Sequence, residues 1–128
     1  LRTVTEVQTC ALPIYVVTNH TGDIIRYNDK TAYIPEELKS VKSPAWLNDI
    51  TNYHNVGDMN RCWGDGSCMQ LGDFYGLDDV ATEKPVVYQG WADVYGDWIK
   101  RYGFAGFLLN IVEHHGRNDA SNTTTVNG

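Results

Sequence analysis

The stretch "ATEKPVVYQGWADVYGDWIKRYGFAGFLL", residues 81–109, decides the fold because it reads as a helix followed at once by a strand. Apolar residues recur at steps of three and four along 81–103, which places them on one face of a helix. The members of this apolar stripe are Val87, Trp91, Val94, Tyr95, Trp98 and Tyr102. Thr82 is the expected N-cap and Gly103 the expected helix stop. We expect the stripe to pack in the core and "AGFLL" (105–109) to form the strand.

A second strand is expected near the start of the chain, where the β-branched run "YVVT" (15–18) ends in a polar loop. Residues 19–81 show little sustained periodicity, which is typical of an inserted functional excursion. The order strand, excursion, helix, strand predicts a right-handed βαβ crossover and a parallel sheet. Because chemistry in such sheets lies just past the carboxyl ends of the strands, Asn19, His20 and Asn110 are the candidate functional residues.

Composition limits the class of protein. With 128 residues and 42% hydrophobic residues, the chain is long enough for one modest domain with a core. The net charge of −6 comes with no basic patch, so a nucleic-acid partner is not expected. No stretch approaches the roughly 18 apolar residues of a membrane helix. We therefore expect neither nucleic acid nor membrane as a partner.

Two of the three cysteines lie close together in the Gly-rich loop "RCWGDGSCMQ". The first interpretation of Cys62 and Cys68 is a local disulfide, which would imply an oxidising compartment. The alternative is two free thiols. Metal binding by the pair is not expected, because no other Cys or His has ligand spacing nearby.

Two motifs resemble signatures of the α-amylase family of retaining glycoside hydrolases. "YVVTNH" (15–20) is similar to Asp-Val-Val-x-Asn-His, and "GFLLNIVEH" (106–114) is similar to Gly-Phe-Arg-x-Asp-x-x-Lys-His. The resemblance covers 15–115 and implies an α/β fold, a (β/α)8 TIM barrel. This chain would supply only part of that barrel: the third strand, an irregular B-type loop insertion (21–76), the third helix and the fourth strand. The polar tail 116–128 is expected to be disordered.

The resemblance also assigns the catalytic positions. Retaining glycosidases use two carboxyl groups, one as nucleophile and one as acid/base. The family nucleophile, an Asp, falls at Asn110, whose amide cannot carry the negative charge that covalent catalysis needs. Leu108 stands where the family has the Arg that holds the nucleophile ionised. The family acid/base Glu lies on a later strand, beyond residue 128.

Substrate-binding positions follow from the same resemblance. His20 matches the family His that hydrogen-bonds a sugar hydroxyl. Tyr15 stands at a family Asp position and Glu113 at a family Lys position. Trp46, Tyr53, Trp63 and His54 lie in the loop region, where they could stack on sugars or pack in the core of the loop.

A structural calcium ion is implied for the calcium-binding members of the family. Asn19 and Asp79 match side-chain ligands, and His114 would contribute its backbone carbonyl, which suits the mixed oxygen ligands of calcium. The alternative is that Asn19 caps a turn and Asp79 is solvated.

The first 14 residues are interpreted as a non-native leader. "VQTCALPI" (7–14) back-translates as GTT CAG ACG TGT GCT CTT CCG ATC, which resembles a sequencing-library adapter followed by one T. That T would turn an Asp codon into the Tyr15 codon. The hypothesis requires this string in the coding DNA directly before the Tyr15 codon, and a different codon choice there would exclude it.

The expected function is that of a fragment of an α-amylase-like glycoside hydrolase, inactive by itself. Its partner would be an α-glucan of the starch or maltooligosaccharide type, and its location extracellular or periplasmic. Two alternatives stay open. One is a non-catalytic α-glucan-binding homologue, for which Leu108 and Asn110 are authentic, and the other is a transglycosylase or debranching member of the family.

Overall fold

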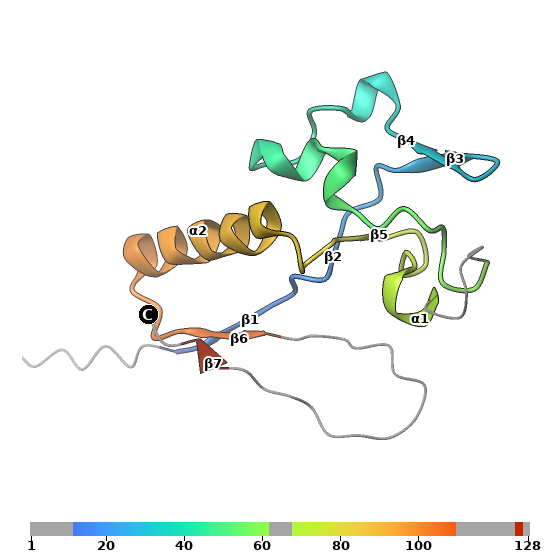
Figure 1. The fold of residues 1–128 in the computed structure, drawn as a ribbon. Coiled ribbons are helices and arrows are strands. Elements are labelled where there is room, and N and C mark those ends of the chain that lie inside the picture. Colours follow the sequence, from blue (N-terminus) through green and yellow to red (C-terminus); the bar gives the residue numbers. More distant parts are fainter. Residues whose placement is uncertain (1–11, 62–67, 110–124, 127–128) are drawn as a thin grey trace, which may run out of the picture.

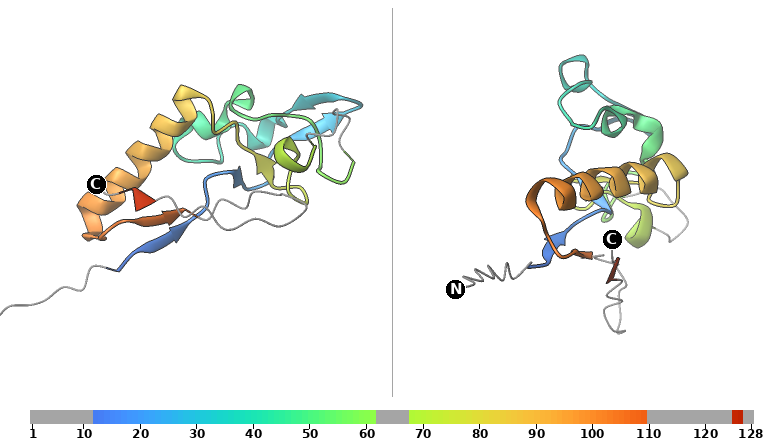
Figure 2. Two further views of the ribbon diagram at one scale, coloured as in Figure 1. Left: turned by 60° about the horizontal axis from the view of Figure 1, so that its bottom comes forward. Right: turned by 90° about the vertical axis from the view of Figure 1, so that its left-hand side faces the viewer.

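The computed structural model describes residues 12–61, 68–109 and 125–126. The main helix, α2 (Pro85–Tyr102), runs alongside the strands β1 (Ile14–Val16) and β6 (Phe107–Leu109), while the excursion lies beyond the start of the helix (Figure 1). The excursion contains β2 (His20–Thr21), β3 (Arg26–Asn28), β4 (Thr31–Tyr33), η1 (Glu36–Leu38), η2 (Ala45–Asn48), η3 (Ile50–Asn52), α1 (Cys68–Leu71) and β5 (Asp78–Asp79). Two further views show the same arrangement, with the helix over the strand pair (Figure 2).

The predicted βαβ unit is present, because β1 and β6 pair in parallel with α2 as the crossover. The register joins Ile14 to Phe107 and Val16 to Leu109. Ile14, assigned to the leader from the sequence, is therefore a strand residue in this fold. Within the segment 116–128, which was expected to be disordered, the structure describes only β7 (Thr125–Val126), which pairs antiparallel with β6.

The helix begins later than the sequence pattern indicates. Its N-cap is Lys84 and not Thr82, and Lys84 makes no side-chain cap hydrogen bond. Pro85 occupies the first helical turn, where its fixed φ and missing N–H are tolerated, so the helix starts there. The predicted stop is confirmed: Gly103 adopts φ 67° and donates its N–H to Ile99 O at 2.8 Å.

The core joins the excursion to the first turns of α2. Its buried members are Ile24, Ile25, Tyr53, Val80 and Val87. Trp46 and Trp91 pack against this cluster from η2 and α2. The excursion therefore has little regular structure but shares one core with the helix.

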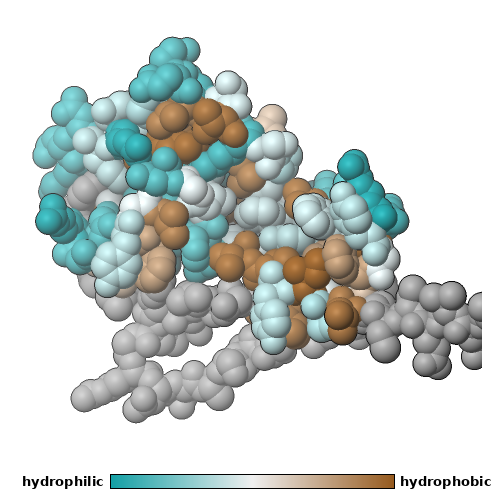
Figure 3. All heavy atoms as spheres, turned by 180° about the vertical axis from the view of Figure 1, so that it is seen from behind, coloured by the Kyte–Doolittle hydropathy of each residue, from teal (hydrophilic) through white to brown (hydrophobic). Residues whose placement is uncertain are grey.

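The apolar stripe of α2 is buried only in its first half. Val87 is 0% exposed, whereas Trp98 and Tyr102 are 47% and 61% exposed. The expectation of core packing is wrong for these last two, because no described element covers the end of the helix. They contact each other and Phe104 instead. Apart from these aromatic residues, hydrophobic side chains gather in one region of the surface on the face opposite to that of Figure 1 (Figure 3).

Candidate functional site

The candidate site lies where the two parallel strands end. Because β1 and β6 run in the same direction, their carboxyl ends meet at one edge of the sheet. The chain continues from β1 through Thr18 into Asn19 and His20, while Leu109 is the last residue of β6. Asn110 follows Leu109 directly, but it lies outside the described residues, as do Glu113 and His114.

The structure brings Asn19 and His20 next to Asp79. In the antiparallel pair of β2 and β5, His20 is the register partner of Asp79. The backbone N–H of Val80 donates to Asn19 O at 2.8 Å. Asp79 is only 7% exposed, so the alternative in which it is solvated does not hold. The two residues matched to calcium ligands thus lie on adjacent segments, Asn19 directly before β2 and Asp79 in β5.

His54 connects this group to the start of α2. Its Nδ1 contacts the Asp79 carboxylate, and its Nε2 lies 3.1 Å from Glu83 Oε2. Burial by itself lowers the pKa of His54, but hydrogen bonds and the negative charges of Asp79 and Glu83 raise it above the usual value. The His54 ring therefore pairs with two carboxylates, a role that the sequence reading, which offered sugar stacking or packing, did not include.

Asp73 is a second residue that the sequence reading missed. Its side chain accepts a hydrogen bond from Tyr27 OH at 2.6 Å and one from the backbone N–H of Asp79 at 2.9 Å. Burial raises the pKa of Asp73 to about 6, and the nearby charges of Asp78 and Asp79 add to this effect. The run "GDFYGLDDV" (72–80) could have indicated such a residue. Burial of three acidic side chains in so short a segment costs free energy unless each finds hydrogen-bond partners.

These pKa shifts predict how stability depends on pH. A carboxyl whose folded pKa is raised stabilises the fold below its unfolded pKa and loses that contribution as pH rises through the folded value. For Asp73, with values of 3.8 and about 6, the free energy of unfolding should fall by about 2 kcal/mol between pH 4 and 6.5. His54 adds a loss in the same direction, from its ordinary value of 6.5 up through its raised folded pKa.

Urea unfolding at a series of pH values checks this dependence. Asp73→Asn should remove the fall between pH 4 and 6.5. Asp49→Asn serves as the opposite case, because hydrogen bonds from Thr51 lower the pKa of Asp49 and so stabilise the fold above pH 3.8. An unchanged slope in Asp73→Asn would contradict the assignment.

Two positions that depart from the family pattern are register partners. Tyr15 in β1 pairs with Leu108 in β6, and Tyr15 is 75% exposed. An Asp and an Arg at these two positions would oppose each other across the parallel pair. Where the resemblance implies an Asp and an Arg, this chain thus pairs two uncharged side chains, Tyr15 and Leu108.

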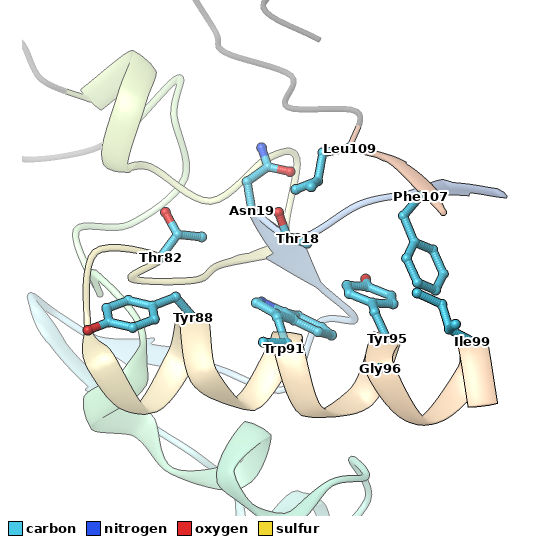
Figure 4. Close-up of a pocket in the computed structure, with 11 residues that line it drawn as sticks. Thr18, Asn19, Thr82, Tyr88, Trp91, Tyr95, Gly96, Ile99, Phe107 and Leu109 are labelled. Carbon is cyan, nitrogen blue, oxygen red and sulfur yellow. The ribbon is translucent and has the colours of Figure 1, made fainter. Parts of the chain in front are cut away.

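A cavity of about 480 Å³ opens between α2 and the ends of β1 and β6 (Figure 4). Aromatic and aliphatic side chains form most of its wall, including those of Trp91, Tyr95, Ile99, Phe107 and Leu109. Thr18 and Asn19 add polar atoms at the strand end. The hydroxyl of Tyr95 donates to Val17 O at 3.2 Å, which ties the helix to the segment after β1.

The loop aromatics that the structure describes pack in the core. Tyr53 is 3% exposed and donates its hydroxyl to Leu47 O at 2.6 Å. The Trp46 ring meets the Trp91 ring edge-on at 5.1 Å. Packing, and not sugar stacking, is thus the outcome for Tyr53 and Trp46, and Trp63 lies outside the described residues.

Cys68 is disulfide-bonded. Cys62 lies outside the described residues, so the pairing of these two cysteines stays a prediction. Within the described ranges no group of three or more His, Cys, Asp or Glu side chains is arranged to hold a metal ion. None of the described helices combines the length and apolar character needed to cross a membrane.

No protein-family model matches the chain. An α-amylase from Streptomyces lividans is 30% identical over 141 aligned positions, which cover 77% of this chain and 15% of that protein. A crystal structure of an α-amylase from Geobacillus thermoleovorans, complexed with acarbose, matches with a TM-score of 0.50 and 28% identity. That match covers 80% of this chain and 19% of the Geobacillus chain.

The chain therefore spans less than one fifth of either relative, at 15% and 19% of their lengths. The parallel β1–α2–β6 unit is part of an α/β barrel, as the structural match indicates. The sequence motifs, the parallel crossover and both matches agree, and the chain belongs to the α-amylase family.

Proposed function

We propose that the chain is part of a glycoside hydrolase acting on α-glucans of the starch or maltooligosaccharide type. The observation that carries this proposal is the placement of Asn19 and His20 at the shared carboxyl edge of β1 and β6, in a chain of the α-amylase family. The Geobacillus relative was crystallised with acarbose, which supports a carbohydrate as the ligand.

In this proposal His20 binds substrate and the chain by itself does not hydrolyse it. The imidazole donates or accepts one hydrogen bond with a sugar hydroxyl at the strand edge. Hydrolysis with retention needs two carboxyl groups about 5 Å apart. Asn110 cannot serve as one of them, and the second is proposed to lie on a later strand of a longer protein. The segment 21–76 is proposed to be the B-type insertion of the barrel.

Acarbose binding and starch hydrolysis test the proposal. We expect the purified chain to release no reducing sugar from starch and to bind acarbose weakly. His20→Ala should weaken that binding by about tenfold, the effect of one lost hydrogen bond. Tyr33→Ala, which removes an aromatic ring that is 46% exposed on β4, is the control for non-specific stacking.

Starch hydrolysis by this chain, or equal acarbose binding by His20→Ala and the unmodified chain, would contradict the proposal. A full-length parent distinguishes a hydrolase from a transglycosylase or debranching enzyme by its products.

A non-catalytic α-glucan-binding homologue is the second candidate. This candidate requires Leu108 and Asn110 to be authentic, because they place uncharged side chains where the resemblance implies the Arg and the nucleophilic Asp. In a full-length parent, Leu108→Arg with Asn110→Asp and Tyr15→Asp should restore hydrolysis if only these positions block it. Glucan binding without turnover in that triple variant would favour the binding protein.

We also propose a structural calcium ion at Asn19 and Asp79. An amide and a carboxylate supply the oxygen ligands that calcium prefers, and the hydrogen bond from Val80 N–H to Asn19 O brings Asn19 close to the strand that carries Asp79. Asp79 also contacts His54, and the His114 carbonyl, which lies outside the described residues, is proposed as a further ligand. Equal melting temperatures in calcium and in chelator would exclude such an ion.

The parent is proposed to be extracellular or periplasmic. The disulfide at Cys68 supports an oxidising compartment. Free thiols on every cysteine of protein recovered from its native source would contradict this location.

A further inference from the structure

A lysine with almost no exposed surface lies beside the strand that carries His20. The ammonium of Lys42 donates to Asp78 Oδ2 at 2.8 Å, to Thr21 Oγ1 at 2.6 Å and to Tyr53 OH at 3.1 Å. Its side chain is 10% exposed. An ammonium group has three N–H donors, so all three are satisfied within the protein. Such a fully bonded, largely buried lysine side chain holds its partners at fixed distances.

Asp78 is the fixed end of this arrangement. Its side chain is 1% exposed. Besides the lysine, the carboxylate accepts the backbone N–H of Ile24 at 2.9 Å and that of Ile25 at 3.2 Å. It therefore holds the segment that follows β2, while the lysine holds β2 itself through Thr21.

The backbone of Lys42 is fixed as well. Its N–H donates to Asn48 Oδ1 at 2.9 Å, and Asn48 Nδ2 donates to Lys42 O at 2.6 Å. This pair of hydrogen bonds closes the loop between η1 and η2 around the lysine. The backbone of Lys42 is therefore held in place within the excursion, which limits the positions that its ammonium can reach.

The link from Lys42 to His20 is short. Thr21 is the residue after His20, and together they form β2. A shift of β2 therefore moves the His20 imidazole relative to its surroundings, including the Phe74 ring, whose centroid lies 5.7 Å from that of the imidazole.

We propose that Lys42 is a positioning residue that sets the place of His20 through the Thr21 hydroxyl. The proposal rests on the proposed role of His20 as a sugar contact. A purely structural lysine would add stability without affecting the imidazole, and the two roles predict different results.

Thr21→Val tests the link, because it removes the hydroxyl that accepts from Lys42 and lies 3.3 Å from Tyr53 OH, and it leaves the pair of Lys42 and Asp78 in place. Valine has nearly the same shape as threonine and suits a strand. We expect changed His20 imidazole signals in the NMR spectrum and about tenfold weaker acarbose binding, since the sugar contact loses its alignment. Thr21→Ser keeps the hydroxyl and should give wild-type signals and affinity.

Ile99→Ala is the control for general destabilisation, because it truncates the cavity wall on α2 and no hydrogen bond of the lysine. The proposal is overturned if Thr21→Val leaves the His20 signals unchanged, or if Ile99→Ala shifts them equally. If Thr21→Val does not fold, Lys42→Arg replaces it, because it keeps the charge but changes the donor geometry. We then expect the same changes in the His20 signals and in acarbose affinity.

Failure of the proposed function gives a different result. If the unmodified chain shows no acarbose affinity, the sugar-binding role fails, while the comparison of His20 signals still decides whether Lys42 positions the imidazole.

Discussion

Asp78→Asn is expected to lower the free energy of unfolding by about 3–5 kcal/mol, the usual cost of leaving a buried charge without its partner. The substitution keeps the shape of the side chain but removes the negative charge that faces the Lys42 ammonium at 2.8 Å. Asparagine also has one acceptor oxygen in place of two, so either the Ile25 N–H loses its acceptor, or both Lys42 and the Ile24 N–H do. Urea unfolding of the purified chain measures the change.

Two further variants show whether the charge pair is the cause. Lys42→Met should destabilise the chain comparably, and the double variant Lys42→Met with Asp78→Asn should lose much less than the sum of the two single changes. Lys39→Met is the matched control, since Lys39 and Glu36 form an ion pair at the surface, with side chains 56% and 84% exposed. That control should change stability by less than about 1 kcal/mol. Additive losses in the double variant would mean that the ion pair is not responsible.

Gly90→Ala is expected to destabilise the chain by about 3 kcal/mol, the upper part of the usual range for overpacking. Alanine normally favours a helix interior over glycine by about 1 kcal/mol. Here, however, a Cβ on Gly90 would lie 2.4 Å from Cε2 and 2.6 Å from Nε1 of Trp46. The indole cannot retreat easily, because it packs edge-on against Trp91 and belongs to the core around η2. The steric term therefore outweighs helix propensity.

Gly96→Ala separates these two effects within the same helix. A Cβ on Gly96 meets no atom within 4 Å, so only the helix propensity changes. We expect Gly96→Ala to raise the free energy of unfolding by up to about 1 kcal/mol, opposite in sign to Gly90→Ala. Thermal and urea unfolding of both variants measure the difference. Equal signs would show that the Trp46 contact does not control the result at Gly90.

The parallel crossover could be predicted from the sequence because its signals are local. The apolar steps along α2 and Gly103 at its end depend on neighbouring residues. The start of the helix at Pro85 was not predicted, because Thr82 is a preferred N-cap residue whereas the observed N-cap, Lys84, makes no side-chain cap hydrogen bond. The edge that carries Asn19 and His20 followed from the strand order and from motif resemblance.

The buried charges could not be predicted, because their partners are distant in the sequence. Lys42 and Asp78 are separated by 36 positions. Nothing in the local sequence of Lys42 distinguishes it from a solvated lysine. Burial of the stripe was overestimated for Trp98 and Tyr102, because periodicity shows which residues share a face but not whether another element covers that face.

The antiparallel strand β7 has a consequence for how the sheet could grow. It pairs with Phe107 and Leu108, on the side of β6 away from β1. A barrel adds its next strand to that same side, in parallel. Extension of the sheet therefore requires strand exchange, in which an incoming parallel strand displaces β7. Only two register pairs join β7 to β6. Release of β7 would leave the hydrogen-bonding edge of β6 free to pair with the incoming parallel strand.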